Sequence, residues 1–179
     1  AWMDLSYTPR FVAVNVSPRQ LCHASFVETV ASVLAKHQLP AACLELEVTE
    51  GVLVENREQA ASRLDQLSRL GIKLSIDDFG TGYSSLSYLQ HYPFDTLKID
   101  RSFIVDIPAN RGSAKLVKAI VAMAKSLDLQ LVAEGVEASD QVTFLQALGC
   151  DLLQGYYYSA PLTAPQFLDW VRVHNLSDY

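Results

Sequence analysis

The stretch 74–86, "LSIDDFGTGYSSL", changes character halfway along, from an apolar segment to a polar loop that contains glycine. Two adjacent carboxylates, Asp77 and Asp78, lie at the junction, and Gly80 and Gly82 follow them. In parallel α/β sheets, ligands bind at the carboxyl ends of the strands. The stretch therefore predicts a buried strand, Lys73–Phe79, whose acidic end faces a functional site.

Apolar segments of strand length alternate along the chain with amphipathic segments of helix length. The predicted strands are Phe11–Val16, Leu44–Thr49, Lys73–Phe79, Thr96–Asp100, Leu129–Gly135 and Leu152–Tyr158. The predicted helices are Ala24–His37, Arg57–Leu70, Ser85–Gln90, Ser113–Leu127, Ser139–Leu148 and Ala164–Val173. Six βα units predict a parallel sheet covered by helices. An open doubly wound sheet and a (β/α)8-type barrel both satisfy this pattern, and a barrel usually needs about 250 residues and eight units.

Composition predicts one soluble globular domain. The chain has 179 residues, half of them hydrophobic, and a net charge of −6, which argues against DNA and anionic membranes as partners. Three widely spaced cysteines predict free thiols in a reducing cytoplasm. No signal peptide or apolar run of about 20 residues occurs, so we expect a cytoplasmic domain without direct membrane contact, although its parent protein could be membrane-attached.

Every predicted strand carries, at or near its end, a polar residue that a buried strand normally excludes. These residues are Asn15, Glu45, Glu47, Glu50, Asp77, Asp78, Lys98, Asp100, Glu134, Glu137 and Gln154. One polar strand end is ordinary, but six in a parallel sheet are expected to converge on one mouth. Carboxylate and amide oxygens are suitable ligands for Mg²⁺, Mn²⁺ or Ca²⁺. Two such ions about 3.5–4 Å apart form the usual site for attack on a phosphodiester.

Lys98 is the one basic residue in this set. It can orient a water molecule or stabilise charge on a phosphoryl group, or it can simply pair with Asp77 or Glu134. We favour the catalytic role, because a lysine inside a parallel strand is costly to bury.

Six ordered motifs resemble those of the EAL domain family, bacterial phosphodiesterases that hydrolyse cyclic di-GMP to linear pGpG. They are "NVS" at 15–17, "ELEVTE" at 45–50, "DDFGTGYSSL" at 77–86, "LKID" at 97–100, "AEGVE" at 133–137 and "QGYYYSAP" at 154–161. The resemblance covers essentially the whole chain. It implies a modified (β/α)8 TIM-type barrel, incomplete here with about six βα units, whose active site lies at the carboxyl ends of the strands.

The resemblance also implies a role for individual residues. The implied metal ligands are Asn15, Glu47, Asp77 and Asp78. The implied catalytic residues are Lys98, Glu134 and Asp78, with Lys98 helping to position the hydrolytic water. The implied contacts to water or substrate are Gln20, Glu137, Gln154 and Tyr156. Glu50 is implied to anchor a mobile loop, Asp78–Leu86, that couples metal binding, ligand binding and dimerisation.

The implied cofactors are two Mg²⁺ or Mn²⁺ ions, with Ca²⁺ as an inhibitory ion. The implied partners are cyclic di-GMP and a second copy of the chain in a homodimer. GGDEF or sensory domains are expected elsewhere in the parent protein.

One departure from the family pattern concerns the tripeptide for which the family is named. No Glu-Ala-Leu tripeptide occurs in these residues, although its glutamate is a metal ligand in the family. We therefore expect 1–179 to be a single EAL-type domain lacking its N-terminal portion, with two open sheet edges and weak or no catalysis. The alternative is a non-catalytic cyclic di-GMP sensor that acts through dimerisation.

Overall fold

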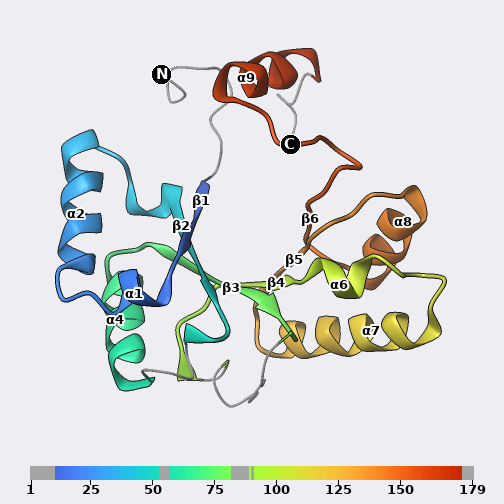
Figure 1. Cartoon of the computed structure of the whole chain (residues 1–179), viewed down its shortest axis with the longest axis horizontal. Coiled ribbons are helices and arrows are strands. Elements are labelled where there is room, and N and C mark those ends of the chain that lie inside the picture. The colour runs from blue at the N-terminus through green and yellow to red at the C-terminus, as the bar shows by residue number, and fades with distance from the viewer. Residues whose placement is uncertain (1–10, 53–56, 82–88, 90, 175–179) are drawn as a thin grey trace.

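The protein forms one curled sheet of six parallel strands in a computed structural model that describes residues 11–52, 57–81, 89 and 91–174. The strands are β1 (Val12–Val16), β2 (Leu44–Thr49), β3 (Lys73–Phe79), β4 (Thr96–Ile99), β5 (Gln130–Ala133) and β6 (Leu152–Leu153). They lie side by side in chain order, and each neighbouring pair is parallel (Figure 1). A doubly wound sheet would reverse its strand order partway, so the barrel-type prediction is confirmed.

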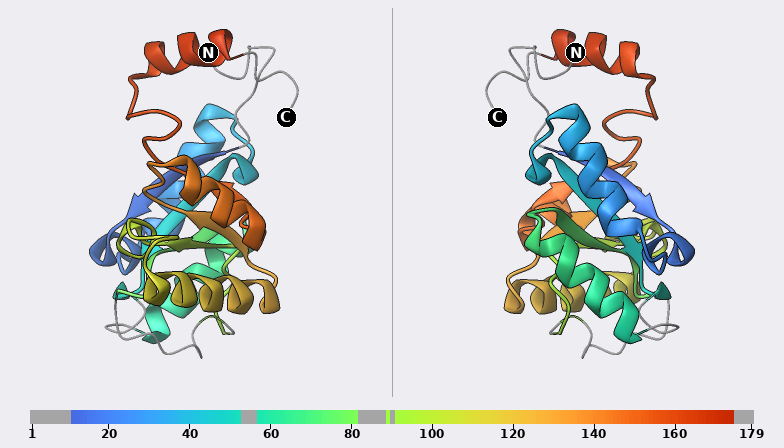
Figure 2. Two further views of the ribbon diagram at one scale, coloured as in Figure 1. Left: turned by 90° about the vertical axis from the view of Figure 1, so that its right-hand side faces the viewer. Right: turned by 90° about the vertical axis from the view of Figure 1, so that its left-hand side faces the viewer.

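Eight helices are present among the described residues, and the longer ones other than α9 lie on the outside of the curled sheet (Figures 1 and 2). The eight are α1 (Pro18–Leu21), α2 (Phe26–His37), η1 (Ala41–Cys43, a 3-10 helix), α4 (Arg57–Arg69), α6 (Arg101–Ile104), α7 (Arg111–Ser126), α8 (Ser139–Leu148) and α9 (Ala164–Val173). Helices α2 and α4 lie beside the first strands and α7 and α8 beside the last, whereas α9 lies apart from them (Figures 1 and 2). Except for Leu89, the predicted helix Ser85–Gln90 lies outside the described residues. Within the described ranges, no helix is long and apolar enough to cross a membrane.

The hydrophobic core lies between the sheet and these helices. Leu74 and Ile76 of β3 and Leu97 of β4 are fully buried, as are Leu64 and Leu67 of α4. Burying one such side chain contributes about 1.5–3 kcal/mol. Because strand side chains alternate between two faces, the residues between these apolar ones point to the inside of the curl. The alternation therefore places the polar residues of the strands in the barrel interior.

The predicted strand Leu152–Tyr158 is wrong beyond Leu153. At Gly155 the chain passes so close to the segment after β5 that a Cβ atom there would overlap the backbone of Val136. The amide of Tyr157 donates to the carbonyl of Val136, and that of Tyr158 donates to the carbonyl of Gly155. The chain therefore turns after β6 instead of continuing along the sheet.

Strands β4 and β5 end one and two residues earlier than predicted, at Ile99 and Ala133. Asp100 ends β4 because its side chain accepts a hydrogen bond from the amide of Ser102 (3.0 Å) and so caps α6. Gly135, after β5, has a φ of 70°, in the left-handed region that glycine adopts most easily. Both departures lie at the edge of the sheet where the polar residues gather.

The cysteines are unpaired, in agreement with the free thiols predicted. Cys22, Cys43 and Cys150 are each partly buried. Burial raises the pKa of the Cys150 thiol to about 11, and a thiol of such high pKa is a poor nucleophile at neutral pH. We assign Cys150 a packing role.

Candidate active site

A buried lysine lies at the centre of the polar residues in the barrel interior. Lys98 of β4 is only 4% exposed, and its Nζ lies 2.6 Å from Oε1 of Glu47, 2.7 Å from Oε1 of Glu134 and 3.2 Å from Oδ1 of Asp77. The three carboxylates come from β2, from the segment after β5 and from β3. Parallel strands bring their carboxyl ends to one edge, and this is why residues 87 positions apart in the chain meet at one ammonium group.

The Lys98 ammonium is held in its charged form. Burial alone would lower its pKa, but hydrogen bonds to Glu134 and Glu47 outweigh burial and raise the pKa above the ordinary value of 10.5. A lysine that remains protonated at neutral pH cannot accept a proton from water. It can donate hydrogen bonds and stabilise negative charge on neighbouring atoms.

An irregularity in β3 brings Asp77 and Asp78 together. The register between β3 and β4 shifts between Ile76 and Phe79, and Asp78 has a φ of 54°. In a regular strand, neighbouring side chains point to opposite faces. The left-handed residue in the bulge turns the chain so that both carboxylates lie on the same side, and oxygens of Asp77, Asp78 and Glu134 all come within 4.8 Å of one another.

The carboxylates of this cluster outnumber its cations. Burial is the main reason why the pKa of Asp78 is raised, and the nearby charge of Asp77 raises it further. Burial likewise raises the pKa of Glu134, although its hydrogen bond with Lys98 acts in the opposite direction. Four carboxylates therefore face one ammonium group. A hard divalent cation with oxygen ligands suits such a donor set and would relieve its repulsion.

The structure brings together about half of the residues that the sequence predicts for the site. Those in contact are Glu47, Asp77, Asp78, Lys98 and Glu134. Asn15 is exposed at the end of β1, where its register partner is Glu47. It therefore lies on the strand next to the cluster.

The predicted substrate contacts lie in segments that follow the carboxyl ends of β1, β5 and β6. The side chain of Gln20 accepts hydrogen bonds from Ser17 and so caps α1. Glu137 pairs with Arg101 at 2.7 Å, and Gln154 and Tyr156 are exposed in the turn after β6. All four residues are exposed.

Two buried acids of β2 and the residues after it differ in their hydrogen bonding. Glu45, two residues before Glu47, accepts a hydrogen bond from the hydroxyl of Thr96 (3.4 Å), and burial raises its pKa. Glu50, just after β2, is 4% exposed, and neither of its carboxylate oxygens has a hydrogen-bond partner among the described residues. The sequence indicated Glu45 as a polar strand residue but assigned it no role at the site.

Gly135 gives a direct test of how tightly the segment after β5 is packed. A Cβ atom at residue 135 would overlap the side chain of Arg101, and the positive φ disfavours any other residue. We expect Gly135→Ala to destabilise the protein by about 2 kcal/mol, which lowers the Tm by roughly 4–8 °C. Gly51→Ala is the matched control, because no atom of the described residues lies within 4 Å of a Cβ there. Equal Tm values for the two variants in thermal denaturation would contradict this account of the packing.

A curled parallel sheet with a polar cluster at the carboxyl ends of its strands places this chain in the class of TIM-type barrels, in which active sites lie at that end. A sequence model of one family, described as the EAL domain, matches residues 2–161. The chain therefore belongs to the EAL domain family, as its six motifs indicated.

Relatives within this family are named for cyclic di-GMP chemistry. The chain is 48% identical over 91% of its length to the cyclic di-GMP phosphodiesterase NbdA of Pseudomonas aeruginosa, and covers 21% of NbdA. It is 44% identical over 93% of its length to MucR of the same organism, a bifunctional diguanylate cyclase/cyclic di-GMP phosphodiesterase, and covers 24% of MucR. The chain thus spans about a fifth to a quarter of these relatives.

Solved structures show the same fold. The PaMucR phosphodiesterase in complex with c-di-GMP matches with a TM-score of 0.83 and 46% identity, over 88% of this chain and 64% of that one. A calcium/cy-diGMP complex of BlrP1 from Klebsiella pneumoniae matches with a TM-score of 0.79 and 34% identity, over 84% of this chain and 39% of that one.

Proposed function

We propose that this chain is the EAL-type part of a metal-dependent phosphodiesterase that hydrolyses cyclic di-GMP to linear pGpG. The observation that carries the proposal is the buried cluster of Glu47, Asp77, Asp78 and Glu134 around Lys98. The names of NbdA and MucR support the substrate. The excess of carboxylates supports divalent cations as cofactors.

In this proposal, Asn15, Glu47 and Asp77 would hold one Mg²⁺ or Mn²⁺ ion, and Asp78 together with Asp77 would hold a second. These ions would lower the pKa of a bound water and neutralise phosphate charge. Lys98, which stays protonated, donates a hydrogen bond that orients the attacking water or stabilises a phosphoryl oxygen. Glu134 holds the Lys98 ammonium through their 2.7 Å contact.

Glu50 serves in this proposal as the anchor of the Asp78–Leu86 loop. Residues 82–86 of this loop lie outside the described residues. The support for this role is the carboxylate of Glu50, which is buried and without a hydrogen-bond partner among the described residues. A buried carboxylate without a partner is costly, so hydrogen-bond donors supplied by the loop would stabilise it.

The remaining assignments concern substrate and assembly. We assign Gln20, Glu137, Gln154 and Tyr156 to contacts with cyclic di-GMP at the mouth. A homodimer, with GGDEF or sensory domains in the parent protein, completes the proposed assembly. The name of MucR, which combines cyclase and phosphodiesterase activities, supports the expectation of a GGDEF partner.

The direct test is chromatographic detection of pGpG after incubation of the chain with cyclic di-GMP and Mg²⁺ or Mn²⁺. In the parent protein, the expected result is turnover that disappears with EDTA and falls when Ca²⁺ replaces Mg²⁺, and residues 1–179 alone should show weak or no turnover. The same assay on the chain within its parent protein measures how much activity depends on additional residues. Tight binding of cyclic di-GMP without turnover in both forms would instead favour a sensor.

Metal binding should also be visible as added stability. Mn²⁺ at about 100 times its Kd should stabilise the fold by about 2.7 kcal/mol, which raises the Tm by roughly 5–11 °C. The physical reason is that the ion neutralises buried carboxylates that repel one another. Thermal denaturation with and without MnCl₂ measures the shift, with NaCl of equal ionic strength as the control. Equal shifts with both salts would count against a specific metal site.

A further inference from the structure

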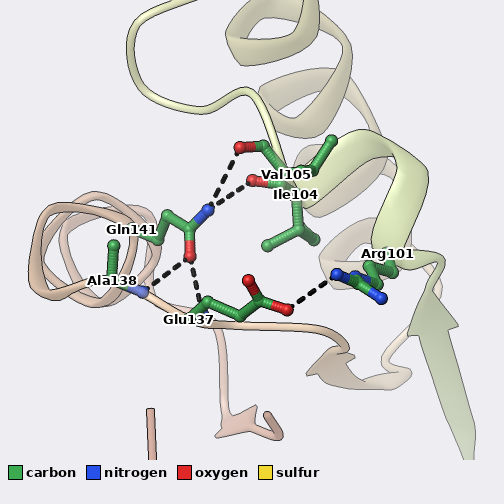
Figure 3. A network of polar contacts seen from close by, with 6 residues as sticks. All are labelled: Arg101, Ile104, Val105, Glu137, Ala138 and Gln141. Carbon is green, nitrogen blue, oxygen red and sulfur yellow. Dashed lines mark hydrogen bonds and ion pairs between the residues drawn. The ribbon is translucent and has the colours of Figure 1, made fainter. Parts of the chain in front are cut away.

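The side chain of Gln141 connects two segments that flank the site. Gln141 lies in the first turn of α8 and is only 5% exposed. Its Oε1 accepts hydrogen bonds from the backbone amides of Glu137 (2.8 Å) and Ala138 (3.0 Å), and its Nε2 donates to the carbonyls of Ile104 (3.0 Å) and Val105 (3.3 Å) (Figure 3). Both donors and both acceptor positions of the amide are therefore in use.

The two segments follow the two strands that position the contact between Lys98 and Glu134. Ile104 ends α6, the short helix that follows the β4 strand of Lys98. Glu137 ends the segment that begins at Glu134, directly after β5. The amide of Gln141 thus joins the segment that begins at Glu134 to α6, which follows the strand of Lys98, and Lys98 and Glu134 meet at 2.7 Å.

A second link joins the same two segments nearer the surface. Arg101 of α6 forms an ion pair with Glu137, and its side chain packs against Gly135 (Figure 3). Both side chains of this pair are largely exposed, and exposed ion pairs contribute only about 0–1 kcal/mol. The buried amide of Gln141, shielded from water, is the stronger of the two links.

Capping of a helix explains only half of these contacts. Gln20 in α1 and Gln166 in α9 occupy the same third helical position, and each accepts a hydrogen bond from a preceding backbone amide. Both of these glutamines are exposed. Capping requires only the acceptor oxygen, so the two hydrogen bonds from Nε2 of Gln141 to α6 serve another purpose.

We propose that Gln141 is a positioning residue that holds the segment 134–138 against α6 and so keeps Glu134 in place beside Lys98 and the metal ligands. This inference rests on the proposed function for its effect on turnover, but not for its effect on structure. An amide is required, because no carboxylate or apolar side chain both accepts two hydrogen bonds and donates two.

Gln141→Glu separates the two halves of the contact. The carboxylate retains the acceptor for Glu137 and Ala138, but its second oxygen faces the carbonyls of Ile104 and Val105. Gln141→Met, of similar length, removes both halves without adding a charge and serves if the glutamate variant does not fold. Gln166→Glu is the matched control, since it makes the same chemical change at an exposed cap.

Hydrogen exchange, Mn²⁺ titration and steady-state kinetics on the whole chain test the proposal. In Gln141→Glu or Gln141→Met, we expect faster amide exchange over residues 134–138. Mn²⁺ affinity and kcat should each fall by about 10–100-fold, the usual effect of removing a residue that orients a site. KM should change little, because the lost contacts do not touch substrate. Gln166→Glu should leave all of these quantities unchanged.

The outcomes that overturn the proposal differ from those that overturn the proposed function. Unchanged exchange over 134–138, or faster exchange with unchanged Mn²⁺ affinity, removes Gln141 from its positioning role. If the parent chain itself releases no pGpG, the proposed function fails. The exchange and Mn²⁺ measurements then still decide whether Gln141 positions the cluster.

Discussion

Replacing Lys98 with methionine is expected to destabilise the protein by about 3–5 kcal/mol, the usual cost of leaving buried charges without their partner. The variant removes the ammonium group that lies within 3.2 Å of three carboxylates. Methionine fills nearly the same space, so the loss measures charge and not a cavity. Urea denaturation without divalent cations gives the free energy of unfolding.

The control for this prediction is Lys73→Met. Lys73 pairs with Asp95 at the opposite end of β3, where both side chains are partly exposed. Breaking such a pair should cost only about 0–1 kcal/mol. If Lys98→Met is no more destabilising than Lys73→Met, the buried cluster does not depend on its lysine.

The stabilising effect of Lys98 should also have a characteristic pH dependence. Its pKa in the folded state is raised above the unfolded value of 10.5. The contribution of the ammonium group is therefore fully present below the unfolded pKa and is lost only as pH rises through the folded pKa. The difference in unfolding free energy between the wild type and Lys98→Met should stay constant from neutral pH to about pH 9, whereas a difference that shrinks over this range would contradict the raised pKa.

Replacing Asp77 with asparagine should have the largest effect on turnover, about a 10³-fold loss of kcat when it is measured in the parent protein. Asp77 contacts Lys98 and also belongs to the group of oxygens shared with Asp78 and Glu134. Its loss weakens both proposed metal positions, and metal stabilisation of a phosphoryl transition state is worth several kcal/mol, each 1.36 kcal/mol being tenfold in rate.

Stability and activity should change in opposite directions in this variant. Asparagine has the size of aspartate but no charge, and Lys98 keeps its contacts to Glu47 and Glu134. Without metal, Asp77→Asn should be at least as stable as the wild type, because fewer carboxylates repel one another. The increase in Tm caused by Mn²⁺ should largely disappear.

Asp151→Asn is the control for Asp77→Asn, because Asp151 accepts a hydrogen bond from the amide of Leu131 (2.8 Å) at the amino end of β6. The Asp151→Asn variant should lose some stability and retain the turnover of the wild type. Full turnover in Asp77→Asn would remove Asp77 from the set of metal ligands.

Much of the site could be predicted from sequence because it depends on strand periodicity. A polar residue at or near the end of a strand pattern is placed at the carboxyl edge of a parallel sheet, and this rule predicts the positions of Glu47, Asp77, Lys98 and Glu134. Family motifs then added residues, such as Gln20 and Tyr156, whose positions no periodicity predicts.

What the sequence determined by itself was the order of strands and helices, the polar end of each strand and the family. Only the tertiary structure decided that Asp77 and Asp78 share one side, because this depends on a bulge and a φ of 54° at Asp78. It also decided that β6 ends at Leu153 and that Gln141 joins α8 to α6. These features arise from contacts between residues distant along the chain, such as Gly155 with Val136, and local sequence patterns carry no information about such contacts.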